Sequence, residues 1–157
     1  MLPKLNNYKD LITKLDYDMK KLQETNHIYD LLNCLLTLNS LPEWIIKSDT
    51  ASESLKKIAE EKVKIMKGIN GFILDQNSLF DNIDHQLRFI RLICNHTKHK
   101  TNSKQIPIIE SIPGTGFPML LPARFCLIVA IGNLRVDGEF LAYQVSEFWK
   151  EKVSSNP

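Results

Sequence analysis

Apolar residues recur every three or four positions over much of the chain, which is the spacing of one face of a helix. The first such run covers residues 5–22 and the second covers residues 28–38. We therefore predict one long helix, or two helices with a kink near Asn26. We expect Pro42 to end this segment, because proline lacks the amide hydrogen that a helix needs. Residues 41–46 are then predicted to start a short helix or turn.

Three further helices follow from the same reasoning. The polar residues 48–54 suit the N-cap of a helix whose apolar positions lie between residues 55 and 66, and which should end at the glycines of residues 68–71. Residues 83–94 place isoleucine, leucine and cysteine on one side of another helix. Residues 143–153 carry the aromatic and valine positions of a last helix.

The amino-acid composition changes between the last two helices. Residues 101–124 contain four prolines and two glycines, which predicts a loop with little regular structure. Within residues 125–140, a β-branched run is followed by Asp137-Gly138, which indicates either a tight hairpin turn or a turn into the last helix. We predict an all-α fold, an up-and-down bundle of four or five helices with a small β-hairpin or loop excursion before the last helix. Residues 1–157 are expected to form a single domain.

Composition agrees with a globular protein, since 43% of the residues are hydrophobic and 24% are charged. The N-terminus lacks the apolar segment of a signal peptide, and the longest apolar run is too short to span a bilayer. The three cysteines are widely separated and lie among apolar residues, which favours reduced thiols over disulfides. We therefore expect a cytoplasmic protein without membrane association.

Positive charge is concentrated in one stretch of a chain whose net charge is only +2. No acidic residue lies between His85 and Ile109. The basic and histidine side chains of this stretch are Arg88, Arg91, Lys98, Lys100 and Lys104 together with His85, His96 and His99. Such a combination can bind polyanions and can transfer protons near neutral pH.

On an ideal helix, Asp84, Arg91, Asn95 and His99 lie within about 60° of Arg88, with His85 and His96 at the shoulder of this stripe. Guanidinium groups bind phosphate through two hydrogen bonds, so this stripe suits a phosphate-bearing ligand. A structural interpretation remains open. Arg88 and Asp84 are four residues apart and could form an ion pair that only stabilises the helix.

Arg91-x4-His96 and the following Asn95-x-x-Lys98-His99 resemble the motif of the HEPN superfamily, whose members are helical bundles. The order of elements is also similar, with the motif on a helix that precedes a hairpin and a final helix. The resemblance implies a homodimer in which two motifs meet and cut RNA without a metal or other cofactor.

The roles implied by this resemblance are specific. Arg91 would hold the phosphate and His96 would act as acid and base, with His99 as the alternative histidine. The substrate would be contacted by Arg88, Asn95, Lys98 and Lys100. Two features depart from the pattern: Leu92 follows the arginine, where active members often have a polar residue, and Arg91 and His96 lie about 140° apart on an ideal helix.

We therefore expect an RNA-binding protein that acts as a metal-independent endoribonuclease in a defence or toxin–antitoxin system, with a neutralising partner protein. The alternative is a catalytically silent helical module that docks an acidic partner or nucleic acid. A zinc site formed by His85, His96 and His99 is disfavoured, because the neighbouring side chains are cationic. Sequence-specific DNA binding is disfavoured by a pI near 8.4 and by the lack of a helix-turn-helix pattern.

Overall fold

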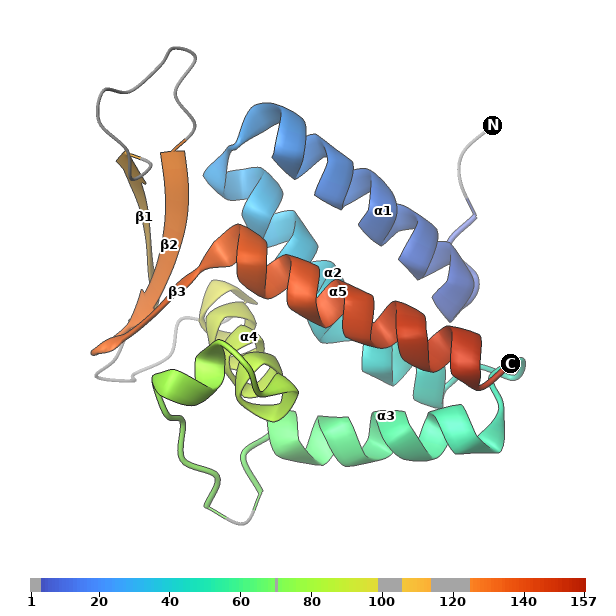
Figure 1. Ribbon diagram of the computed structural model, residues 1–157. Helices are drawn as coiled ribbons and strands as arrows, with labels where there is room; N and C mark the ends of the chain where they lie inside the picture. The colour runs from blue at the N-terminus through green and yellow to red at the C-terminus, as the bar shows by residue number, and fades with distance from the viewer. Residues whose placement is uncertain (1–3, 70, 99–105, 114–124) are drawn as a thin grey trace.

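The computed structural model describes residues 4–69, 71–98, 106–113 and 125–157 (Figure 1). Helices dominate this part of the chain, and a small sheet precedes the last helix. The elements in order are α1 (Tyr8–Thr25), α2 (Ile28–Ile46), α3 (Glu53–Met66), the 3-10 helix η1 (Asn77–Leu79), α4 (Ile83–Lys98), β1 (Ile108–Pro113), β2 (Phe125–Ile131), β3 (Leu134–Asp137) and α5 (Gly138–Ser155).

The break near Asn26 is complete, so the first two apolar runs form two separate helices. Asn26 adopts a left-handed conformation with a φ of 50°, and its backbone N–H donates to the carbonyl oxygen of Leu22 at 2.8 Å. The next residue, His27, begins α2 by accepting the backbone N–H of Tyr29 on its Nδ1 atom at 3.1 Å. The cap that ends α1 and the cap that begins α2 are therefore adjacent residues.

The prediction that Pro42 ends the second helix was wrong. Helix α2 continues through Pro42 to Ile46, so residues 41–46 form its last turns instead of a new element. A proline inside a helix costs about 3 kcal/mol. Continuation keeps Ile45 fully buried and leaves Trp44 and Ile46 packed against the core, and Pro42 is itself buried. Burial contributes about 1.5–3 kcal/mol for a fully buried side chain, so these contacts together offset the local cost of the proline.

The other helices follow the sequence patterns. Ser52 accepts the backbone N–H of Leu55 and so caps α3. Asp137 caps α5 by accepting the backbone N–H of Phe140 at 2.8 Å, so Asp137-Gly138 leads into the last helix. Gly138 is also required by packing, because a Cβ there would lie 2.4 Å from a methyl carbon of Leu31.

The expectation of a loop over residues 101–124 was wrong for residues 108–113, which form β1. Strands β1, β2 and β3 make an antiparallel sheet in that order. Ile109 lies opposite Val129, which lies opposite Val136, and all three pack into or against the core. The fold is therefore mixed, mostly helical with a small sheet, and not purely all-α. The rest of the predicted loop, residues 101–105 and 114–124, lies outside the described residues.

Helix α2 occupies the middle of the helical layer, since it contacts α1, α3, α4 and α5. Figure 1 shows the sheet at one end of the helices, where β2 and β3 pack against α5. The largest fully buried side chains include Trp149 of α5 and Phe89 of α4. Among the described residues, none of the helices combines the length and the apolar content that a membrane-spanning helix needs.

Candidate functional site

The helix that carries the predicted motif is α4. Asn82 precedes it and accepts the backbone N–H of Asp84 on its side-chain oxygen at 2.9 Å, which satisfies one amide of the first turn. Leu87, Ile90 and Cys94 are buried, as their spacing predicts. Phe89 and Ile93 are buried as well, so the apolar side of α4 is wider than the sequence stripe indicated.

Helix α4 is a central element of the fold. It contacts α2, α3, α5 and η1. Between residues 83 and 97, only Thr97 is exposed, and all the other residues are buried or half-buried. The polar side of α4 therefore meets the neighbouring helices, and partners from other parts of the chain decide what each of its charged residues does.

Asp84 takes its partner from α3. The Lys62 ammonium lies 2.8 Å from an Asp84 carboxylate oxygen, and the Lys62 side chain is only 13% exposed. The alternative of an Asp84–Arg88 pair along α4 is replaced by this link between helices. The link fixes the start of α4 against α3.

Arg88 also reaches α3. Its guanidinium donates a 2.7 Å hydrogen bond to the carbonyl oxygen of Met66, the last residue of that helix. Such a carbonyl has no partner within its own helix, and a cation is favoured at this end of the helix dipole. Burial, and to a smaller extent the charge of Arg91, lowers the pKa of Arg88. This contact accounts for Arg88 without a ligand.

Arg91 is held more loosely. Among the described residues it pairs with Glu43 in the last turns of α2, with 3.8 Å between a guanidinium nitrogen and a carboxylate oxygen. The Arg91 side chain is 23% exposed, and its Nε atom is buried without a hydrogen-bond partner. Within the described part of the chain, the Nε donor of Arg91 is therefore unused.

The structure describes the remaining motif residues only in part. Asn95 and His96 are half-buried on the last turns of α4. Lys98 ends the helix, but its side chain is not described. His99 and Lys100 lie outside the described residues. Arg91 and His96 thus occupy one helix, about 140° apart on an ideal helix, and the choice between His96 and His99 stays a prediction.

His85 has a structural environment. Its ring lies 4.7 Å from the ring of Phe72, and its Nδ1 atom accepts the backbone N–H of Asp75 at 3.2 Å. Within the described ranges, no three side chains among histidine, cysteine, aspartate and glutamate gather as metal ligands would.

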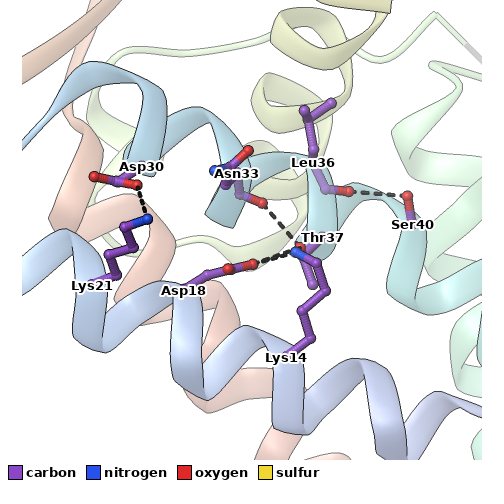
Figure 2. A network of polar contacts seen from close by, with 8 residues as sticks. All are labelled: Lys14, Asp18, Lys21, Asp30, Asn33, Leu36, Thr37 and Ser40. Atoms are coloured by element: carbon purple, nitrogen blue, oxygen red, sulfur yellow. Dashed lines mark hydrogen bonds and ion pairs between the residues drawn. The ribbon is translucent and has the colours of Figure 1, made fainter. Parts of the chain in front are cut away.

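A separate polar cluster joins α1 to α2 (Figure 2). Asp18 is buried, and its carboxylate lies 2.5 Å from the Lys14 ammonium and 3.1 Å from the Thr37 hydroxyl. Lys14 also donates to that hydroxyl at 2.9 Å. Burial and then the charge of Asp18 raise the pKa of the nearby Cys34 thiol to about 12, so this cysteine is not a nucleophile at neutral pH.

Sequence reasoning missed the residues that hold the arginines of α4. Glu43 lies in α2 and Met66 ends α3, far from the motif in sequence. No spacing rule within α4 could indicate them. Arg88, Arg91 and Met66 line none of three hollows on the described surface, although Glu43 lines one of them. The hollow of about 600 Å³ lies along α1 beside Lys14, Tyr17 and Asp18.

The motif therefore lies on a half-buried helix whose arginines also connect it to its neighbours. Comparison with protein-family models, with curated proteins and with solved structures gives no match to this chain.

Proposed function

We propose that the chain binds RNA through the second half of α4, with Arg91 as the main phosphate contact. The supporting observation is an imbalance of charge. Arg88 and Arg91 are close enough that, after burial, the charge of Arg91 lowers the pKa of Arg88, and Glu43 is the carboxylate paired with Arg91. Two partly desolvated guanidinium groups and one carboxylate leave a positive site, and an RNA phosphate would balance its charge.

The proposal extends to cleavage without a metal ion. His96 would take the proton from a ribose 2′-hydroxyl as its oxygen attacks the neighbouring phosphorus. The bond from phosphorus to the 5′-oxygen would break, and that oxygen would receive a proton from an imidazolium. Arg91 would stabilise the negative charge that develops on the phosphate oxygens. His99 is the alternative acid and base, with Asn95, Lys98 and Lys100 contacting the substrate.

The biological setting of the proposal rests on the resemblance of Arg91-x4-His96 to the HEPN motif. It comprises a homodimer, a defence or toxin–antitoxin role and a neutralising partner protein. A cytoplasmic location is part of the same proposal, and no cofactor is invoked.

Binding is tested with labelled single-stranded RNA by fluorescence anisotropy at several salt concentrations. Arg91→Ala should weaken binding about 10-fold and lower the salt dependence by about one phosphate contact. Glu43→Gln removes the competing carboxylate at nearly constant shape, so it should strengthen binding. Lys57→Ala, on an exposed position of α3, is the control for loss of one positive charge and should change affinity less.

Cleavage is tested on the same RNA with excess EDTA. Turnover by the wild type that is lost in Arg91→Ala, and in either His96→Ala or His99→Ala, would support the nuclease and identify the histidine. Circular dichroism and thermal melting would show that each variant is folded. If Glu43→Gln and Arg91→Ala alter only stability and leave RNA affinity unchanged, the proposed phosphate contact is wrong.

The second candidate is a catalytically silent module that docks an acidic partner or nucleic acid. It is favoured by the bonds that tie Arg88 to Met66 and Arg91 to Glu43, since both guanidinium groups then serve the fold. Salt-sensitive binding with no turnover in any condition would support this candidate over the nuclease.

A further inference from the structure

The sheet has two edges, and the described structure treats them differently. At the β3 edge, the side chain of Gln76 bonds to both backbone polar groups of Arg135. Its Oε1 atom accepts the N–H of Arg135 at 2.8 Å, and its Nε2 atom donates to the carbonyl oxygen of Arg135 at 2.7 Å. An edge strand otherwise offers such groups to another strand. Gln76 therefore closes this edge.

At the β1 edge, no described side chain bonds to the backbone in this way, although Pro107 and Pro113 lack an amide hydrogen. The backbone groups of residues 106–113 that point away from β2 have no hydrogen-bond partner within the described ranges. Two apolar side chains are also exposed there, with Ile106 at 55% and Ile108 at 52%. Ile109, the residue between Ile108 and Glu110, packs against the core and holds the strand in place. An exposed apolar edge strand on a fixed sheet is a template for pairing.

The charges at this edge allow a close approach of two identical strands. Glu110 is the one charged residue of β1, which reads Ile-Ile-Glu-Ser-Ile-Pro. Its carboxylate lies 3.2 Å from the Arg135 guanidinium. Two copies could therefore meet along β1 without bringing together unpaired like charges.

We propose that β1 pairs antiparallel with β1 of a second copy of this chain, which joins two three-stranded sheets into one continuous sheet. An antiparallel contact between identical strands is isologous, so each copy makes the same contacts as its partner. The closed β3 edge prevents addition of a third copy. The joined sheet therefore stops at two copies and does not grow into a fibre. This contact involves β1 and not α4, so it is a different interface from the meeting of two motifs in the proposed function.

Sedimentation velocity over a range of protein concentrations tests the assembly. The wild type should pass from monomer to dimer as its concentration rises. Ile106→Lys combined with Ile108→Lys should raise the dissociation constant at least 10-fold, because it removes the exposed apolar side chains and adds four positive charges along the two paired strands. Ile73→Lys is the matched control. Ile73 is 83% exposed in the segment between α3 and α4, and this change should leave the dimer intact.

Hydrogen exchange of the wild type provides a measurement that needs no variant. Exchange of the amides in residues 106–113 should slow with rising protein concentration, while exchange at the β3 edge should not change. A monomer at every concentration would overturn the proposal and leave an extended segment of another protein as the occupant of this edge. A dimer that persists in the lysine variant, or a dimer without concentration-dependent protection of β1, would overturn it as well.

Discussion

The guanidinium of Arg88 lies directly against Gly68, so a Cβ atom added to Gly68 would be 2.8 Å from the central guanidinium carbon. This closeness follows from the hydrogen bond between Arg88 and Met66. Gly68 also has a φ of 73°, a region that favours glycine. The end of α3 is thus shaped around the arginine of a different helix.

Gly68→Ala should lower the free energy of unfolding more than Gly71→Ala does. Both glycines have a positive φ, so both variants lose about 1 kcal/mol from backbone strain. Only Gly68→Ala also pushes Arg88 from its place, because Gly71 has open space around it. Urea unfolding of the two variants gives the comparison, and equal losses would show that Arg88 moves aside freely.

The hydrogen bonds between Gln76 and the β3 edge give a second prediction. Gln76→Ala removes two hydrogen bonds to Arg135 and should lower the free energy of unfolding by about 1 kcal/mol. It should also allow association beyond a dimer, because the β3 edge becomes available for pairing. Asn77→Ala, at the neighbouring exposed position of η1, is the control. Light scattering that is the same for both variants would mean that Gln76 does not protect the edge.

Two lysine–aspartate pairs whose aspartates lie in α1 allow a matched test of burial. The Lys14 and Lys150 side chains are 39% and 37% exposed, but their partners Asp18 and Asp16 are 9% and 55% exposed. Lys14→Met should cost about 1–3 kcal/mol, because it leaves a buried carboxylate without its cation. Lys150→Met should cost about 0–1 kcal/mol. Thermal unfolding of both variants gives the comparison, and similar losses would contradict the role of Asp18 burial.

The Cys34 thiol predicts a loss of stability in alkali. Its pKa is raised from 9.0 to about 12 by burial and by Asp18, so the unfolded chain loses this proton before the folded chain does. The contribution is fully present below pH 9 and is lost as the pH rises toward 12, by up to about 1.4 kcal/mol per pH unit. Lysines and tyrosines also titrate there, so the wild type must be compared with Cys34→Ala. The stability difference between them should change with pH above 9, and parallel curves would contradict the prediction.

The helices could be predicted because each one buries a stripe that its own sequence displays. The spacing of Leu87, Ile90 and Cys94 predicted the buried side of α4, and the polar residues before Leu55 predicted the cap of α3. The prediction at Pro42 was wrong because the rule for proline considers only the local backbone and not the burial of side chains. Burial of Ile45 and of Pro42 itself decided the outcome there.

Strand β1 and the surroundings of the motif could not be predicted for a shared reason. The segment of β1 is short, follows Pro107 and ends in Pro113, so it looks like a loop until β2 supplies its hydrogen bonds. Arg91 likewise looks like a surface residue until Glu43 is brought to it by α2. Spacing along one helix predicts which residues share a face, but the partners of that face come from distant segments.

The turn at Asn26 and His27 has a consequence for how the chain folds. Only these two residues separate α1 from α2, so the two helices can pack against each other with a small loss of loop entropy. Contacts between neighbouring segments form faster than contacts that close long loops. The α1–α2 hairpin is therefore expected to form early and to offer the exposed side of α2 as a surface on which α4 and α5 assemble. The sheet, whose first two strands are joined by residues 114–124, would then form after α5 has docked.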